Sequence, residues 1–170
     1  MADMALKCSH PIIHAVGEIA VAFGNLELFV SLAIWQLLGI GDKTAVQLAH
    51  AITAEMSFDR KVHAFASMYK IRFPPDANSS ELKQLIARLF EVQDRRNQVL
   101  HSNWPEPDDE AERLRVKSSA KAKHGLVTNV SAETADNMFE IVKAIHDVGQ
   151  DFATFALENI QKKLTTSSSN

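Results

Sequence analysis

Apolar residues recur every three or four positions along much of the chain, which places them on one face of an α-helix. The clearest such stripe predicts a long first helix over residues 10–39, with Pro11 in its first turn. Further stripes predict four more helices, over residues 43–53, 57–72, from Ser79 or Ser80 to about 104, and 132–164. The pattern therefore predicts an all-α fold, a helical bundle of about five helices with long first and last helices.

Turn-forming residues mark the breaks between these stripes. GIGD at 39–42 ends the first helix, and PPDANSS at 74–80 precedes the fourth. Residues 105–130 change from acidic to basic and β-branched without a helical stripe. This change predicts a short irregular or β-hairpin insertion before the last helix, or a flexible basic arm. Ser131 is the expected N-cap of the last helix.

The composition is that of one soluble globular domain. Of the 170 residues, 46% are apolar and 23% are charged, and no linker-like stretch divides the chain. We therefore expect a single helical domain over residues 1–170, with a disordered tail at 165–170. The net charge of −3 and the pI near 6.1 exclude a surface that is basic overall. Any contact with RNA must therefore come from a local patch.

Cysteine content and hydropathy both favour a cytoplasmic protein. Cys8 is the single cysteine and cannot form an internal disulfide, which is typical of a reducing compartment. Residues 19–40 are apolar enough to raise the question of a membrane span, but Asn25 and Glu27 interrupt them. We therefore expect a buried helix and no membrane partner. The N-terminal residues also lack the basic region and apolar core of a signal peptide.

Most familiar kinds of active site find no candidate residues in this sequence. The seven histidines are scattered, and only His10 and His14 have the i, i+4 spacing of a helical metal pair, without a glutamate partner. Glycine-rich phosphate loops and the GxSxG motif of serine hydrolases are absent from the sequence. We therefore expect no metal site and no cofactor.

One polar cluster, RRNQVLH at residues 95–101, lies at the end of the predicted fourth helix. Cleavage of RNA without a metal needs a base for the 2′-hydroxyl proton, which His101 can supply. It also needs a fixed cation for the phosphate, for which the planar fork of Arg96 is suited. Asn97 adds a polar group that can orient one of them, and Arg95 can add a phosphate contact. These residue types predict a site for phosphodiester chemistry.

Helical spacing limits how these side chains can meet. Asn97 and His101 are four residues apart and share one face, whereas Arg96 and His101 diverge by roughly 140°. Arg96 can reach His101 if its long side chain curls round the helix, or if the last turn is distorted. A symmetric dimer would also join them by placing two such helices side by side. The alternative is an ordinary helix end, where cations complement the helix dipole.

The run Arg96-Asn97-Gln98-Val99-Leu100-His101 resembles the Arg-x4–6-His motif of the HEPN superfamily (higher eukaryote and prokaryote nucleotide-binding domains). The motif's place near the end of a late bundle helix is similar too, as is the long first helix with its Gly24-Asn25-Leu26-Glu27 run. The resemblance implies a helical domain that usually dimerises, and in many members acts as a metal-independent endoribonuclease. It implies that Arg96 stabilises the phosphate, that His101 acts as base or acid, and that the product is a 2′,3′-cyclic phosphate.

Glu27 and the tryptophans have structural interpretations as well as functional ones. An unpaired carboxylate deep in the most apolar helix is unfavourable, and Arg95 or Arg96 is a natural partner for Glu27. The alternative is that Glu27 is exposed or lies at an interface. Trp35 and Trp104 are expected in the core rather than as platforms for stacked bases. The basic stretch at 117–124 is expected to be a solvated loop, with contact to RNA phosphates as the alternative.

Two hypotheses follow from the sequence. The first is a homodimeric, metal-independent endoribonuclease of HEPN type that cleaves RNA at a composite site shared between chains. It would serve as a toxin or defence component, with an antitoxin protein as its partner. The second is a non-catalytic helical dimer that binds a nucleotide or another protein and keeps Arg96 and His101 as structure. The low pI favours the second, because an RNA enzyme must attract a polyanion.

Overall fold

The computed structural model describes residues 11–39, 43–105, 113–121 and 125–161. It is a mostly helical bundle whose order is α1 (Pro11–Leu38), α2 (Lys43–Ala54), α3 (Phe58–Arg72), α4 (Ser80–Leu100), strands β1 (Arg113–Lys121) and β2 (Gly125–Glu133), and α5 (Ala135–Phe155). A short 3-10 turn, η1 (Pro74–Asp76), precedes α4, and a π-helical segment, η2 (Ala156–Gln161), continues α5. The predicted bundle of five helices with long first and last members is thus confirmed. The expected tail at 165–170 lies outside the described residues.

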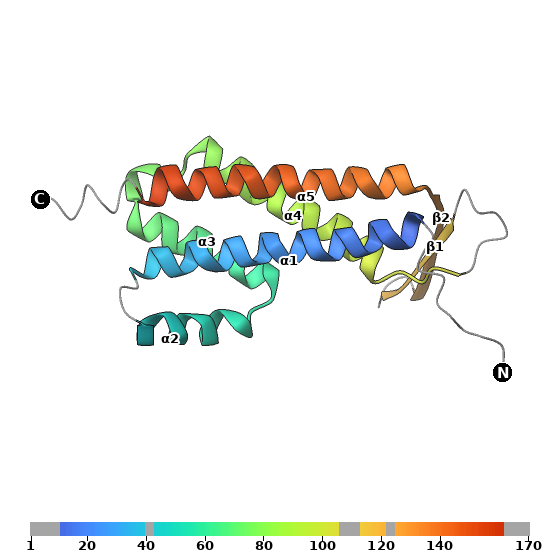
Figure 1. Ribbon diagram of the computed structural model, residues 1–170, viewed down its shortest axis with the longest axis horizontal. Coiled ribbons are helices and arrows are strands. Elements are labelled where there is room, and N and C mark those ends of the chain that lie inside the picture. The colour runs from blue at the N-terminus through green and yellow to red at the C-terminus, as the bar shows by residue number, and fades with distance from the viewer. Residues whose placement is uncertain (1–10, 40–42, 106–112, 122–124, 162–170) are drawn as a thin grey trace, which may run out of the picture.

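The long helix α1 forms the centre of the bundle. Its buried face follows the predicted stripe and packs against α5 and α3, and also against α4. Figure 1 shows α1 and α5 lying side by side along the length of the molecule. The helix ends where predicted, because Gly39 takes a left-handed conformation (φ 69°) and its N–H bonds back to the Gln36 carbonyl at 3.0 Å.

Aromatic side chains from α3 and α5 fill the middle of the core. The Phe65 ring lies 4.9 Å from that of Phe152 and 6.1 Å from that of Tyr69, measured between centroids. Tyr69 in turn lies 5.1 Å from Phe155. These distances are typical of the tilted and edge-to-face arrangements that aromatic rings prefer. Because these rings are almost fully buried, they fix the lateral position of α3 against α5.

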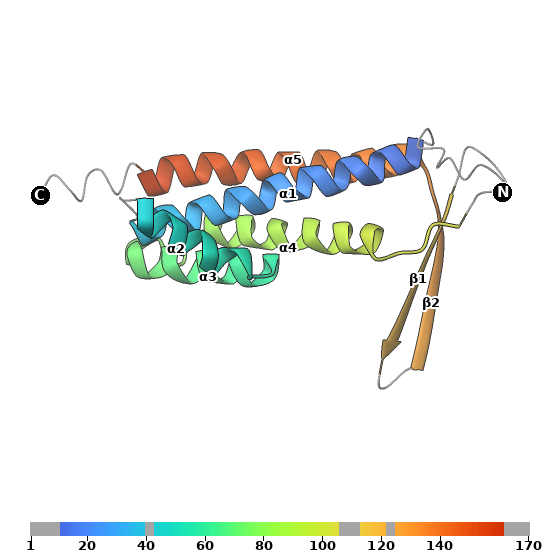
Figure 2. The same cartoon turned by 60° about the horizontal axis from the view of Figure 1, so that its bottom comes forward.

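The insertion before the last helix is a β-hairpin. Strands β1 and β2 pair antiparallel over nine residues each, from Arg113 opposite Glu133 to Lys121 opposite Gly125. Figure 2 shows the hairpin projecting from the end of the bundle where α5 begins. Lys117–Lys121, expected to be part of a solvated loop, therefore belongs to a strand.

The expected N-cap of the last helix is wrong by three residues. Ser131 pairs with Arg115 inside β2, so its backbone is extended and cannot start a helix there. Thr134 caps α5 instead, and its side-chain oxygen accepts from the N–H of Asn137 at 3.2 Å. The last helix also changes character before its predicted end, because residues 156–161 adopt a π-helical form.

Helix α1 is long and apolar enough to cross a membrane by length and composition, with a mean hydropathy of 1.6 in its most apolar window. In the bundle it is the central core helix, in contact with α2, α3, α4 and α5. Both tryptophans are half-buried against the core, as expected. Trp35 also donates to the Thr53 hydroxyl of α2 at 3.0 Å, which ties α2 to α1.

Glu27 has a different partner from the expected ones. Its carboxylate lies 2.7 Å from the Lys61 ammonium of α3, and not against Arg95 or Arg96. The Lys61 side chain is 8% exposed and that of Glu27 is 35% exposed, so the pair lies at the edge of the core between α1 and α3. Lys61 lies on the buried face of α3 together with Phe58, and α3 packs against α1. Arg96 instead lies over the Phe23 ring, one turn earlier on α1.

We expect Glu27→Gln to lower the free energy of unfolding by about 1–3 kcal/mol, because it leaves the Lys61 ammonium buried without a counter-charge. Adding Lys61→Met should restore at least half of the loss, since both charges are then gone. Urea unfolding followed by circular dichroism measures both variants. Asp147→Asn, in the exposed pair with Lys143, is the matched control and should leave the midpoint unchanged. Equal effects of Glu27→Gln and Asp147→Asn would contradict the assignment.

Candidate functional site

The predicted site residues lie on the last two turns of α4 and just beyond its end. The helix begins at its Ser79 cap, and its buried face anchors it in the bundle up to Val99. At the C-terminal end, His101 is the C-cap residue (φ −101°, ψ 20°), and its N–H bonds to the Asn97 carbonyl at 3.2 Å. The indole N–H of Trp104 donates to the Val99 carbonyl at 3.1 Å and holds the following chain against the helix end.

Arg96 is held in place by a neighbour and by the core. Its Nη1 donates to the Asn97 Oδ1 at 2.8 Å, as expected for a residue that orients the arginine. Its Cζ lies 5.0 Å from the centroid of the Phe23 ring of α1, which is a cation–π distance. Its Nε is buried and finds no hydrogen-bond partner within the described part of the chain. The guanidinium is therefore fixed in one direction, with one donor group unused.

His101 lies apart from Arg96. Its side chain is exposed, and within the described residues it forms no hydrogen bond, ion pair or ring contact. Arg96 points to α1, whereas His101 lies past the helix end. Within one chain, no direct hydrogen bond therefore joins the two side chains. This agrees with the divergence expected from helical spacing.

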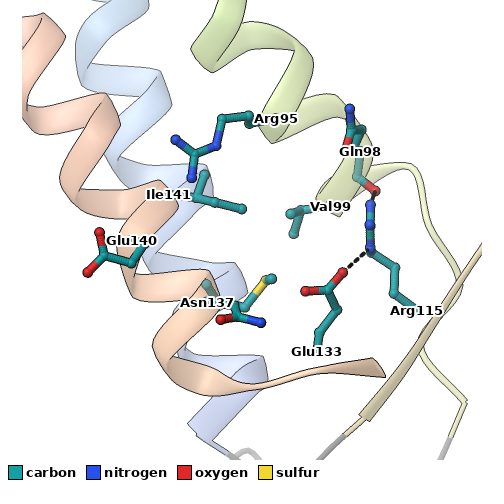
Figure 3. A pocket seen from close by; sticks show the side chains of 9 residues that line it. Arg95, Gln98, Val99, Arg115, Glu133, Asn137, Glu140 and Ile141 are labelled. Atoms are coloured by element: carbon teal, nitrogen blue, oxygen red, sulfur yellow. Dashed lines mark hydrogen bonds and ion pairs between the residues drawn. The ribbon is translucent and has the colours of Figure 1, made fainter. Parts of the chain in front are cut away.

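Arg95 points in a third direction, into a pocket of about 310 Å³ between α4, α5 and the base of the hairpin. Figure 3 shows Arg95 and Gln98 on the α4 side of this pocket, with Glu133 and Arg115 on the hairpin side. The remaining lining residues, both apolar and polar, are Val99, Asn137, Met138, Glu140 and Ile141. No carboxylate in the described part of the chain lies within 4.0 Å of the Arg95 guanidinium. Arg95 therefore lies at this pocket and Arg96 lies against α1, so the two adjacent arginines do not form one cationic patch.

The base of the hairpin is tied to the end of α4 by a network that sequence reasoning missed. Arg115 Nε lies 2.9 Å from the Glu133 carboxylate and donates to the Ser131 hydroxyl at 3.2 Å. Its Nη1 donates to the Gln98 carbonyl at 3.3 Å. The Asn103 backbone also pairs with Val116 of β1 in an isolated bridge. Opposite charges at the two ends of a predicted hairpin were the available signal, but the pairing register was needed to use it.

The described residues contain no group of three or more histidine, cysteine, aspartate and glutamate side chains that could hold a metal ion. Of the expected helical pair, His10 lies outside the described residues. His14 makes an edge-to-face contact with Phe139 of α5, with centroids 6.3 Å apart. His14 therefore packs against the bundle through its ring.

We expect Arg96→Met to change the free energy of unfolding by no more than about 1 kcal/mol. The variant loses the cation–π contact, but it also removes a buried donor without a partner and keeps an apolar stem on Phe23. Phe23→Ala should cost about 3–5 kcal/mol, because it opens a cavity in the core. Urea denaturation compares them. A loss above about 2 kcal/mol for Arg96→Met would show that the arginine is kept for stability and would weaken any catalytic role.

We compared the chain with protein-family models, with curated proteins and with solved structures, and none of the three comparisons found a match.

Proposed function

We propose that the C-terminal end of α4 binds RNA phosphodiesters and cleaves them without a metal ion. The observation that carries this proposal is the Arg96–Asn97 pair, in which a guanidinium is held in a fixed direction with no carboxylate within 4.0 Å in the described part of the chain. Such a preset cation stabilises charge that develops on a phosphate with little reorganisation. The exposed His101 lies at the end of the same helix.

The proposed reaction is attack of a ribose 2′-oxygen on the adjacent phosphorus, with departure of the 5′-oxygen of the next nucleotide. His101 takes the 2′-hydroxyl proton, and Arg96 binds the non-bridging oxygens of the phosphate. The departing 5′-oxygen takes a proton from a water molecule, and the resulting hydroxide takes the proton held by His101, which restores the base. The products are a 2′,3′-cyclic phosphate and a free 5′-hydroxyl. Asn97 holds the guanidinium through its side-chain oxygen, so it acts as a positioning residue.

A second chain is part of the proposal, because one chain does not join the two groups. Arg96 is directed to Phe23 of α1, whereas His101 lies beyond the helix end. If two α4 ends approach one another about a two-fold axis, Arg96 of one chain can face the His101 of the other. The proposed active form is therefore a homodimer with a site shared between chains.

A second candidate function is a non-catalytic module that binds another protein or a nucleotide. The observation in its favour is the packing of Arg96 itself, whose Nε is buried and whose guanidinium lies on a core ring. An arginine used only as structure would be placed in this way. The net charge of −3 also disfavours attraction of a polyanion. This candidate predicts stable folding and no cleavage of any RNA.

We expect the wild-type protein to cleave a labelled RNA of mixed sequence in EDTA, leaving cyclic-phosphate ends. His101→Ala and Arg96→Ala should each lower the rate at least about 100-fold, the usual loss for a proton-transfer group or an oxyanion donor. His63→Ala and Arg72→Ala, at exposed positions of α3, are matched controls and should keep the wild-type rate. No cleavage by folded wild-type protein across many RNAs would favour the non-catalytic module.

Sharing of the site between chains can be tested by mixing the two inactive variants. If Arg96 and His101 act across a dimer, random exchange of subunits makes half of the dimers mixed, each with one intact site. The mixture of Arg96→Ala and His101→Ala chains should then recover about a quarter of the wild-type rate. A site built within one chain recovers nothing. The assay needs prior subunit exchange, which dual fluorescent labelling can follow.

A further inference from the structure

Helix α1 presents an apolar face that no other helix covers within the described residues. Val21 is 64% exposed, Leu28 is 50% exposed and Leu32 is 39% exposed. Gly17 and Gly24 lie on the same face, one turn before Val21 and between Val21 and Leu28, and both are exposed. The two glycines are seven residues apart, as are Val21 and Leu28, so each pair repeats after almost two helical turns. We call Gly17, Val21, Gly24, Leu28 and Leu32 the α1 strip.

The α1 strip lies opposite the buried side of the helix. The centre of the buried side carries Ile19, Leu26 and Val30, all almost fully buried. At about 100° per residue, these side chains point roughly 140–180° away from Val21. The strip contains no charged residue. The α1 strip is therefore a continuous apolar surface exposed to solvent, and it lies on the helix whose opposite side forms the core.

The two glycines of the strip have no explanation inside one chain. A β-carbon added at Gly17 or Gly24 would meet no atom within 4 Å, so neither glycine is needed for a close contact in the bundle. Neither has a positive φ, unlike Gly39. Glycine in a helix interior is destabilising by about 0.5–1 kcal/mol relative to alanine. Two such residues on one apolar line indicate that another molecule approaches the backbone there.

We propose that the α1 strip is the contact surface for α1 of a second copy, packed antiparallel about a two-fold axis. In one register of this pairing, Gly24 lies level with the partner's Val21, and Gly17 lies level with the partner's Leu28. Val21 and Leu28 of one strip then each fit over a glycine of the other. The same two contacts occur again with the chains exchanged, so the surface is complementary to itself, as a two-fold interface requires.

Charge and position favour a second copy over a membrane surface. Helices that lie on membranes are usually rich in lysine and arginine on their polar side, whereas α1 contains neither residue. Its opposite side is the core of the bundle and cannot turn to the lipid. Without flanking cations, the strip has no attraction to anionic lipid headgroups. A self-complementary uncharged strip meets no such difficulty with a second copy.

The size of the strip sets the strength of the pairing. From Gly17 to Leu32 the helix is about 24 Å long and about 10–12 Å wide, which gives roughly 250–300 Å² per chain. Stable dimers bury about 800 Å² per partner. Even with flanking side chains such as Phe29, the contact falls below this size. We therefore expect a concentration-dependent dimer with a dissociation constant in the micromolar range.

This inference goes beyond the proposed ribonuclease function and does not rest on it. Phe23, which supports Arg96, is buried on the side of α1 turned away from the strip. Contact through the strip and contact between α4 ends would use opposite sides of the bundle. Either can therefore be lost by mutation while the other is kept.

Sedimentation velocity over 5–500 μM protein tests the pairing. We expect the wild-type chain to show an association step over this range, from monomer to dimer, or from dimer to tetramer if the α4 ends already pair. Gly24→Leu and Leu28→Lys should each raise the dissociation constant of this step at least tenfold. Gly24→Leu fills open space in the monomer, so it should fold with equal or greater stability in urea. Ala87→Leu, on the exposed side of α4, is the matched control and should change the constant less than twofold. A wild-type chain that shows no such step up to 500 μM, or a step whose dissociation constant all three variants leave unchanged, overturns the proposal.

Cysteine cross-linking tests the register. In a Cys8→Ser background, a mixture of Gly17→Cys and Leu28→Cys chains should form a disulfide dimer under mild oxidation. Either variant alone should form little, because its two sulfurs lie about 16 Å apart along the axis. Efficient cross-linking of each variant to itself would indicate a parallel pair and overturn the antiparallel assignment. Flotation of the wild-type chain, but not of Leu28→Lys, with phosphatidylcholine–phosphatidylglycerol vesicles would assign the strip to a membrane and overturn the pairing.

Discussion

The burial of one face of α1 is the constraint on which the rest of the molecule depends. Eleven residues of this helix are buried, and α3, α4 and α5 are all placed by contact with it. Phe23 shows how this reaches the candidate site. It belongs to the buried face, it contacts the Phe58 ring of α3, and its ring supports the Arg96 guanidinium. The direction of the arginine is thus set by the same packing that holds the bundle together.

Local pattern was sufficient for the helices because each stripe lies within one segment. The limits of α1 and the starts of α3 and α4 follow from Pro11, Gly39 and the serine caps, all of which act on their own neighbours in sequence. Helix α4 ends at Leu100, earlier than the predicted end near residue 104. The error at Ser131 has the same origin. Ser131 is a good cap by type, but β1 lies eighteen positions earlier at Arg113 and draws residues up to Glu133 into a strand. Pairing over that distance is not visible in a local pattern.

Contacts between segments were predicted less well, and Glu27 shows why. The sequence indicated that its carboxylate needs a cation, and it has one. The identity of that cation depends on which helix packs beside Glu27. The apolar stripe of α3 predicts which of its sides is buried, but it does not predict how α3 is rotated relative to α1. Lys61 sits beside Val62 on that buried side, where charge type alone gave no reason to expect it. Arg115 and Glu133 were missed for the same reason.

The candidate site illustrates the limit of a sequence motif. Arg95, Arg96 and His101 look like one cluster when written as RRNQVLH, but the helix sends them to three places. Arg95 faces the pocket beside α5, Arg96 faces Phe23, and His101 lies in solvent past the helix end. Composition could supply the right groups, and helical spacing could show that they diverge. Neither could show what would bring Arg96 and His101 together at one phosphate.

The exposed face of α1 likewise has features that one chain does not explain. Apolar residues were expected to be inside, and those on the buried face of α1 are. Val21 and Leu28, however, are exposed on the opposite face, which also carries Gly17 and Gly24. A single folded chain gives neither the exposed side chains nor the glycines a role, and both features weaken the isolated monomer. A helix that is apolar on both sides is reasonable if each side has a surface to bury, one supplied by its own chain and the other by a second copy. The two proposals therefore assign contacts with a second copy to two places, the exposed face of α1 and the end of α4.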